Sequence, residues 1–292
     1  GVGMVAWIIY FRQAAEYNRE YINLYIKEGA KLGIDFKLIL AEELEFGVKD
    51  NACFIRYQNR KIDYPDFVIC RAIYPLLTRQ LESMSIKVFN NSFVAEICND
   101  KAKTYQYLAK TKIAMADTSF YKSFQLDEIL SSIDEERVIK AVDGHGGSQV
   151  FLVRPDMDDE EIEYIKKALS GSDFVLQPKL GHRNQDLRVY VIGKEIIAAV
   201  LRTAKEGFKS NYSLGGEVCF YNLNDKEKSI VNLIIDQFDF GLVGIDFIIG
   251  DYGELIFNEI EDVVGSRMLY KCSNINIVEK YLHFIKDNCI LS

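Results

Sequence analysis

Short apolar runs alternate with longer amphipathic segments over the first third of the chain. Four runs have the length of buried strands, at residues 5–11, 36–40, 67–70 and 87–89. Apolar positions recur with helical spacing over residues 14–32 and 76–84. Strands that alternate with helices are typical of a parallel sheet, because the helices form the crossover connections. We therefore predict a small parallel α/β unit in this part of the chain.

The middle of the chain has the pattern of a second, smaller unit. A helix is predicted over 100–110, with Asn99 or Asp100 as its N-cap, and an acidic-capped amphipathic helix over 158–169. Three strands are predicted, at 137–142, 149–153 and 173–177. A glycine-rich turn joins the first two of these strands. This part of the chain therefore predicts a compact unit with its own small sheet.

Past Pro178 the pattern becomes mostly antiparallel. Strands are predicted at 187–192, 195–202, 242–249 and 254–261, with a helix near 225–238. Gly193 and Lys194 form a suitable two-residue hairpin turn between the first two strands. We predict an α/β (α+β) chain of three units: an N-terminal unit at 1–97, a central unit at 98–180 and a C-terminal unit at 181–292.

The last predicted hairpin carries three carboxylates on one face. A two-residue loop at Tyr252 and Gly253 would place Asp246 opposite Glu259, with Glu261 on the same face. At about 4 Å two like charges repel by roughly 4 kcal/mol at an effective dielectric constant near 20, so a positive group is expected among them. Oxygen ligands without His or Cys suit Mg²⁺ or Mn²⁺, which usually accompany phosphates. A solvated acidic face is the alternative, which the apolar neighbours of these carboxylates disfavour.

Composition limits the classes of function. The net charge of −8 disfavours non-specific nucleic-acid binding, which requires many basic residues. The six cysteines include no CxxC pair and lie mostly in apolar runs, which favours reduced thiols in the cytoplasm. No apolar run approaches the length of a membrane span or a signal peptide, so we expect no membrane contact. Three histidines leave little material for a histidine-rich metal site.

Two segments could bind an anion. The turn of Asp143, Gly144, His145, Gly146 and Gly147 would expose backbone N–H groups beside Lys140, although an ordinary glycine-rich loop and a surface-facing lysine remain alternatives. The turn lacks the signatures of a P-loop or a dinucleotide fingerprint.

The second segment, 202–216, is basic in an acidic chain and includes Arg202 and Asn211; a solvated basic loop is the alternative. Asp186 and Arg188 share a strand face and could pair with each other. For Arg188, a structural ion pair and an anion-binding role are equally compatible with the pattern.

Taken in order, these segments resemble the ATP-grasp superfamily, most closely its RimK-like peptide-ligase branch. The matching elements are Asn-Asp-Lys-Ala-Lys-Thr at 99–104, Val-Ile-Lys at 138–140, the loop at 144–147, Val-Leu-Gln-Pro-Lys-Leu at 175–180, Asp-Leu-Arg at 186–188, the segment 202–216, Gly-Ile-Asp at 244–246 and Asn-Glu-Ile-Glu at 258–261. The most specific piece is Arg-x-Ala-Lys-Glu-Gly followed by Ser-Asn-x-x-x-Gly-Gly. The resemblance implies an ATP-grasp fold, with the central unit as a lid.

The resemblance also implies roles for individual residues. The nucleotide-binding set would be Lys101, Lys140, Gly144, His145, Gly146, Gly147, Gln177, Lys179, Leu180 and Asp186, in which Gln177, Lys179 and Leu180 form the adenine hinge. Asp246, Glu259 and Glu261 would hold two Mg²⁺ (or Mn²⁺) ions with ATP. The catalytic set would be Arg202, Lys140 and Asn211. Candidate substrate contacts are Arg71, Tyr74, Arg188 and Arg267.

The implied reaction joins a carboxylate to an amine through an acylphosphate, releasing ADP and phosphate. The substrate would be an amino acid, a peptide or a protein terminus, and homo-oligomers are frequent among relatives. An ATP-grasp phosphotransferase and a non-catalytic nucleotide-binding module are the alternatives. The chain departs from the branch in two places. Glu261 and the segment 263–267 stand where relatives have Asn and a proline-glycine pair, and Pro178 replaces an acidic hinge residue.

Overall fold

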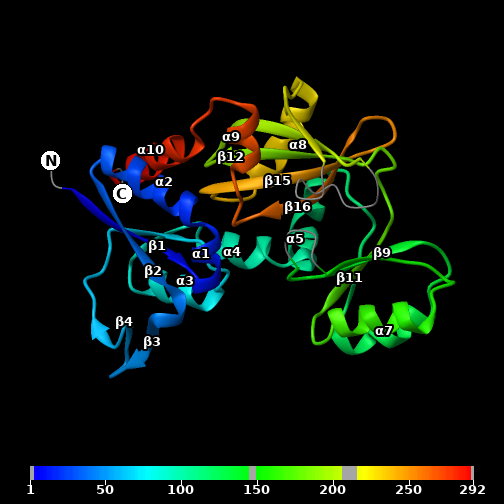
Figure 1. The fold of residues 1–292 in the computed structure, drawn as a ribbon, viewed down its shortest axis with the longest axis horizontal. Coiled ribbons are helices and arrows are strands. Elements are labelled where there is room, and N and C mark those ends of the chain that lie inside the picture. Colours follow the sequence, from blue (N-terminus) through cyan, green and yellow to red (C-terminus); the bar gives the residue numbers. More distant parts are fainter. Residues whose placement is uncertain (1–2, 145–148, 206–215, 291–292) are drawn as a thin grey trace.

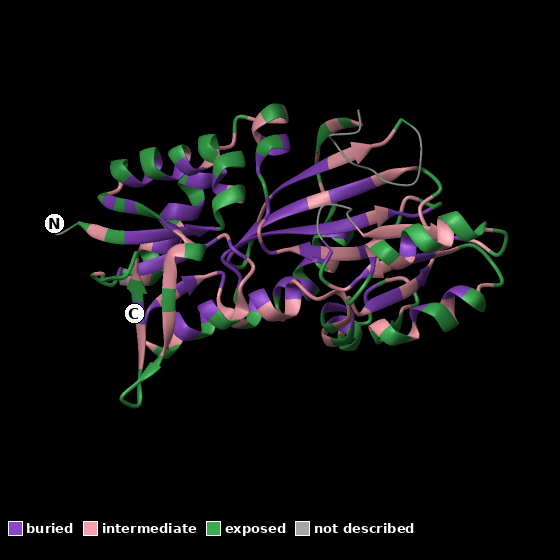
Figure 2. Ribbon diagram, turned by 60° about the horizontal axis from the view of Figure 1, so that its bottom comes forward, coloured by how far each residue is buried: buried purple, intermediate pink, exposed green. Residues whose placement is uncertain are grey.

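The computed structural model describes residues 3–144, 149–205 and 216–290. Figure 1 shows a parallel sheet at one end of the molecule, a small antiparallel sheet at the other end and a large antiparallel sheet between them. Figure 2 shows that the sheets contain most of the buried residues, whereas the outer faces of the helices are exposed. The predicted α/β (α+β) class is therefore confirmed.

The parallel sheet has the strand order β2-β1-β6-β7, with every neighbouring pair parallel. Its elements are β1 (Met4–Tyr10), β2 (Ile34–Leu40), β6 (Phe67–Cys70), β7 (Lys87–Phe89), α1 (Arg12–Tyr17), α2 (Arg19–Lys31) and α3 (Pro75–Ser83). β1 is buried on both faces, as expected for a strand covered by crossover helices. The single helix predicted over 14–32 is divided at Asn18, whose side chain donates a hydrogen bond to the carbonyl of Ala14.

Several N-terminal elements were not predicted from the sequence. They are the three-stranded antiparallel sheet of β3 (Leu44–Lys49), β4 (Ala52–Tyr57) and β5 (Arg60–Lys61), and the helix α4 (Ser92–Cys98). The turns between these strands consist of Asp50-Asn51 and Gln58-Asn59, in which all four residues have positive φ. Asn and Asp tolerate this conformation, so the two dipeptides were the available hairpin signal.

The small antiparallel sheet has the order β10-β9-β11-β8. Its strands are β8 (Ser119–Tyr121), β9 (Arg137–Ala141), β10 (Val150–Val153) and β11 (Phe174–Pro178), and α6 (Leu126–Ser131) and α7 (Asp159–Ala168) pack on it. The predicted acidic cap of α7 is a capping box, in which Asp158 and Glu161 satisfy each other's backbone N–H groups. Leu126, Ile165 and Phe174 are among the residues of its separate apolar core.

The large antiparallel sheet has the order β14-β13-β12-β15-β16. Its strands are β12 (Gln185–Ile192), β13 (Glu195–Thr203), β14 (Glu217–Tyr221), β15 (Leu242–Ile249) and β16 (Leu255–Glu261). One face, which includes Leu187 and Phe247, forms a core with α8 (Asp225–Ile235). On the other face, Tyr190 and Val200 join the core of the parallel sheet, α2 and α10 (Ile277–Ile290). The rest of that face is polar and forms the site described below.

The turn of the last hairpin differs from the prediction. Ile249 pairs with Leu255, so the connection is longer than two residues. The register shifts by one residue between Asp246 and Phe247, because Asn258 forms a bulge in β16. The longer turn and the bulge offset each other, and Asp246 still lies opposite Glu259.

Asn90, which directly follows β7, connects the parallel sheet to this hairpin. Its amide nitrogen donates to the carbonyl of Leu242 at 2.9 Å and to a carboxylate oxygen of Asp262 at 2.6 Å. Its amide oxygen accepts from the backbone N–H of Gly241 at 2.7 Å. These bonds attach both strands of the hairpin to the N-terminal unit. Among the described helices, none is long and apolar enough to cross a membrane.

Candidate active site

A cavity of about 370 Å³ lies between the small and the large antiparallel sheets. The helix α5 (Lys101–Leu108) and the start of α9 (Arg267–Cys272) also contribute to its wall. Charged lining residues are Lys101, Lys140, Asp186, Arg188, Arg202, Glu259, Glu261 and Arg267. Apolar and neutral lining residues include Val138, Val150, Gln177, Pro178, Leu180, Ile248 and Asn258. The cavity therefore combines an apolar part with a highly charged part.

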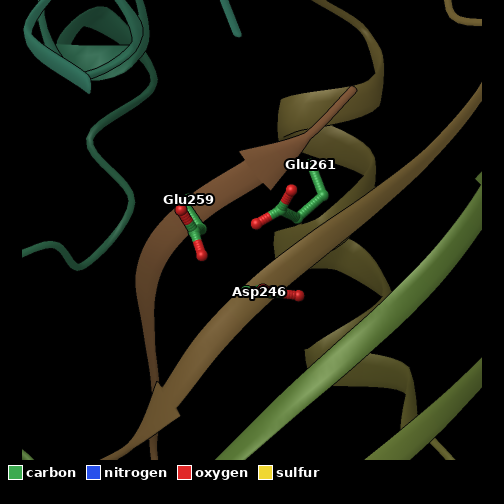
Figure 3. Close-up of side chains that lie close together, drawn as sticks. All are labelled: Asp246, Glu259 and Glu261. Carbon is green, nitrogen blue, oxygen red and sulfur yellow. The ribbon is translucent and has the colours of Figure 1, made fainter. Parts of the chain in front are cut away.

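The three predicted carboxylates form one cluster at the charged end. Asp246, Glu259 and Glu261 each offer an oxygen, and these oxygens lie within 4.8 Å of one another. Figure 3 shows the two glutamates on one strand of the hairpin and Asp246 on the neighbouring strand. The donor set consists of oxygen atoms alone, which suits Mg²⁺ or Mn²⁺. The cluster therefore fits the predicted cation by its chemistry and by its size.

Two arginines already lie against this cluster, which the sequence argument did not foresee. Both carboxylate oxygens of Asp246 accept hydrogen bonds from Arg188, from Nε and from Nη2, each at 2.9 Å. Arg202 donates to Asp186 and also contacts Asp246 at 3.4 Å. The pairing that the sequence suggested between Asp186 and Arg188 is not what the structure has. Instead Asp186 pairs with Arg202, directly opposite on β13, and Arg188 pairs with Asp246, directly opposite on β15.

The buried charges shift one another's pKa values. Burial alone would raise the pKa of Asp246, but Arg188 and Arg202 outweigh burial and hold the pKa below its ordinary value. Burial, followed by repulsion from Glu259, raises the pKa of Glu261 to about 8. Burial likewise raises the pKa of Asp186 to about 7, against the opposing effect of Arg202. The arginines thus compensate Asp246, whereas Glu261 is left with excess negative charge around it.

The metal-free protein is expected to lose stability as pH rises from about 5 to 8. Glu261 faces Glu259, Asp246 and Arg188, and its folded-state pKa of about 8 exceeds its ordinary value of 4.5. The folded state therefore binds the proton more tightly, and this stabilisation is lost as pH rises through that window. Thermal unfolding in EDTA should show a Tm decrease of several degrees that Glu261→Gln reduces, with Glu254→Gln at the exposed turn as the control. An equal decrease in both variants would contradict this account.

Two lysines approach the carboxylates from the opposite wall. Lys101, at the start of α5, donates to the carbonyl of Gly144 and lies 3.5 Å from a carboxylate oxygen of Glu259. Lys140, on β9, donates to the side-chain oxygen of Asn258 at 2.9 Å. Burial lowers the pKa of Lys140 to about 8, against the attraction of Glu259. Asn258 was not among the predicted site residues. Its side chain reaches Lys140 because of the bulge in β16, which the sequence does not reveal. The only sequence signal for a role in the site was its place directly before Glu259.

The predicted adenine hinge is only partly in the cavity wall. Gln177 and Leu180 line it, and Gln177 donates to the hydroxyl of Thr118 at 2.9 Å. Lys179 is not among the described lining residues and instead lies 3.5 Å from Glu136.

The predicted substrate contacts divide in the same way. Arg188 and Arg267 line the cavity, whereas Arg71 and Tyr74 are not among the described lining residues. Tyr74 stacks on Phe11 and packs on Phe46. Arg71 forms contacts inside the protein that are described below. Four predicted residues, His145, Gly146, Gly147 and Asn211, lie outside the described residues.

Comparison with known proteins decides the family. Residues 98–285 match the family model described as the RimK-like ATP-grasp domain. The chain belongs to this family. The uncharacterized protein MG011 of Mycoplasma genitalium is 27% identical over 288 residues, which cover 94% of this chain and 92% of that protein. A probable alpha-L-glutamate ligase of Legionella pneumophila (strain Corby) is 29% identical over 211 residues, which cover 71% of this chain and 70% of that protein.

Solved structures agree on the fold. The D-alanyl-alanine synthetase A of Vibrio cholerae O1 biovar eltor str. N16961 superposes with a TM-score of 0.72 over 100% of both chains, at 14% sequence identity. This likeness shows the ATP-grasp fold. The family match, and not this likeness, identifies the chain as an ATP-dependent carboxylate–amine ligase that forms C–N bonds. ATP and Mg²⁺ are used generally in this ATP-grasp family.

Proposed function

We propose that the cavity binds ATP with its adenine against Gln177, Pro178 and Leu180 and its phosphates between Lys101, Lys140 and the carboxylate cluster. The observation that carries this proposal is that Glu259 and Glu261 of the cluster line the same cavity as both lysines, and that Glu259 lies 3.5 Å from Lys101. The apolar lining at the hinge end suits a base, and the cationic groups suit phosphates. Asp186 Oδ1 is buried without a hydrogen-bond partner in the described structure, which leaves an acceptor for a polar group of a bound ligand.

The proposed cation sites lie between Asp246, Glu259 and Glu261, and we propose Mg²⁺, with two ions in the complete complex. When bound, these ions neutralise the phosphate oxygens and the three carboxylates. Lys101 and Lys140 add positive charge from the opposite wall. Arg202 lies at the edge of the cluster, and its Nε is buried without a partner in the described structure. We assign Arg202 to the carboxylate that receives the phosphoryl group.

The proposed reaction has two steps. An oxygen of the substrate carboxylate attacks the γ-phosphorus, ADP leaves, and an acylphosphate forms. A neutral amine then attacks the acyl carbon, phosphate leaves, and the nitrogen loses a proton as the amide forms. The chain supplies charge and position for both steps rather than a nucleophile, because both developing transition states concentrate negative charge on oxygen.

For the substrate we propose an acidic amino acid or a peptide. Arg267 is exposed, lines the cavity and has no carboxylate partner among the described residues. It donates a hydrogen bond to the hydroxyl of Tyr17 at 3.3 Å. A guanidinium in this position suits a substrate carboxylate. Glutamate, which appears in the name of the Legionella relative, a probable alpha-L-glutamate ligase, is an acidic amino acid of this kind. We propose a reducing, cytoplasmic environment, because the six cysteines include no CxxC pair and because Cys70 and Cys98 are buried thiols.

The test is acceptor-dependent release of ADP. With ATP and Mg²⁺, we expect ADP release to increase at least about tenfold when an amino acid or peptide pair is supplied, and an amide product to form in equal amount. L-glutamate should be the first amine screened, with peptides as carboxylate donors. The alternative phosphotransferase would give a stable phosphorylated product without any amine. That product, detected by mass spectrometry with no amide, would overturn the proposed reaction.

A further inference from the structure

The segment 263–267 connects the carboxylate hairpin to α9. It begins two residues after Glu261 and ends at Arg267, which lines the cavity. The position of Arg267 therefore depends on how the backbone of this segment is held. Val264 and Ser266 within it are buried, whereas Arg267 is exposed.

Val264 is held from two sides. Its side chain packs over Gly244 of β15, where an added Cβ would come within 2.7 Å of Val264 Cγ2. Any larger residue at 244 would therefore displace the segment. Arg71, which directly follows β6 of the N-terminal unit, donates from Nη2 to the carbonyl oxygen of Val264 at 2.9 Å. The backbone of the segment is thus fixed between the parallel sheet and the large antiparallel sheet.

Ser266 is held by Tyr21 of α2. The hydroxyl of Tyr21 and the hydroxyl of Ser266 lie 3.0 Å apart and share a hydrogen bond. The guanidinium of Arg71 stacks over the ring of Tyr21 at 5.2 Å, and its Nε donates to the hydroxyl of Tyr10 at 3.3 Å. Arg71 and Tyr21 therefore position each other as well as the segment.

Within the described part of the chain, Arg71 contacts neutral groups: a carbonyl oxygen, a hydroxyl and an aromatic ring. A guanidinium that leaves water without a carboxylate partner costs free energy, so folding stability alone gives little reason for an arginine at this position. Its planar geometry, however, lets one side chain fix a backbone carbonyl and an aromatic ring at the same time. With these two contacts, Arg71 is suited to fixing the position of the segment 263–267.

We infer that Arg71 and Tyr21 are positioning residues for substrate recognition, which act through the segment 263–267 on Arg267. The inference rests on the proposed function, in which Arg267 binds a substrate carboxylate. Neither residue lines the ATP part of the cavity among the described residues. Their loss should therefore weaken the use of the acidic substrate and leave the use of ATP unchanged.

Tyr21→Phe is the central variant, because it removes one hydroxyl and leaves the ring. It should raise the KM for L-glutamate roughly threefold to tenfold, the range of one net hydrogen bond, and change the KM for ATP and kcat less than about twofold. Arg71→Met should have a larger effect on the same KM, and Arg71→Lys a smaller one, since a lysine keeps the charge and one hydrogen bond. An unchanged KM for L-glutamate in Tyr21→Phe would overturn the inference.

Matched controls separate position from general stability. Tyr107 donates its hydroxyl to the carbonyl of Gln237 at 2.7 Å, and Arg79 pairs with Glu96, both away from the segment. Tyr107→Phe and Arg79→Met should leave the KM for L-glutamate unchanged. If Tyr107→Phe raises this KM as much as Tyr21→Phe does, the effect is one of stability and the inference is wrong.

A second measurement does not depend on the substrate. If no amino acid or peptide stimulates ADP release from the unaltered protein, the proposed function fails, and the positioning is then tested by hydrogen exchange. Tyr21→Phe should speed exchange of the backbone amides of 263–269, with the affinity for ADP and Mg²⁺ unchanged. Exchange in this segment equal to that of the unaltered protein would refute the positioning role.

Discussion

Glu259→Gln is expected to reduce the rate of ATP-dependent amide formation roughly 100-fold to 1,000-fold at saturating Mg²⁺. Glu259 lies opposite Asp246, its carboxylate faces Glu261, and Lys101 lies 3.5 Å away. The amide keeps the size of the side chain but removes the charge that attracts the cation. The protein should still fold, because one of several mutually repelling carboxylates has been neutralised.

Glu254→Gln provides the matched control for this variant. Glu254 belongs to the same hairpin, but it lies at the exposed turn, where its carboxylate accepts from the backbone N–H of Tyr252 at 2.9 Å. Its turnover should equal that of the unaltered protein. ADP release measured over a Mg²⁺ titration distinguishes the two. Full activity of Glu259→Gln at ordinary Mg²⁺ concentration would remove Glu259 from the metal site.

Asp246→Ala is expected to destabilise the metal-free protein by about 3–5 kcal/mol, and it should abolish turnover as well. The side chain of Asp246 is 1% exposed, and it is the carboxylate that compensates Arg188 and also contacts Arg202. Its removal leaves two largely buried guanidinium groups with too little negative charge around them. Urea unfolding in EDTA measures this loss.

The double variant Asp246→Ala with Arg188→Met tests the cause. Because the unpaired guanidinium carries much of the cost, the double variant should be more stable than the sum of the two single variants predicts, by at least about 1 kcal/mol. Simple additivity would show that the two residues do not interact. Glu259→Gln in the same assay should change the free energy of unfolding far less, since Glu259 is 21% exposed and has like charges beside it.

The position of the carboxylate cluster could be predicted from the sequence because it depends on local alternation. A strand places every second side chain on one face, so Asp246, Glu259 and Glu261 come together once the hairpin register is known. The predicted register was correct for Asp246 although the turn was wrong, because the bulge at Asn258 offsets the longer turn. Periodicity carries no information about such a bulge.

The charge pairs within the site could not be predicted in the same way. Arg188 reaches the cluster through the pairing of β12 with β15, which are far apart in the sequence, and Arg202 reaches it because β13 lies on the other side of β12. The order β13-β12-β15-β16 was not readable from any one segment. The sequence argument required a positive group among the carboxylates and assigned that role to a cation alone. The structure shows that arginines provide part of the positive charge, and it leaves Glu261, which lies 4.0 Å from Arg188, as the carboxylate of the cluster with the least compensation.

Arg71 shows the limit of inference from position alone. Its place after a strand of a parallel sheet predicted a substrate contact, because such strand ends often face a ligand. In the structure its contacts are with Val264, Tyr10 and Tyr21 inside the protein. The position after the strand could not reveal that the segment after the hairpin lies against Arg71.

The central claim is that the carboxylate hairpin forms the metal-binding wall of the ATP cavity. A crystal structure with ADP and Mn²⁺, recorded at the manganese absorption edge, tests it most directly. The account predicts anomalous density between Asp246, Glu259 and Glu261, with the diphosphate of ADP beside Lys101 and Lys140. Bound ADP with no anomalous density at these carboxylates, or with manganese held elsewhere, would contradict it.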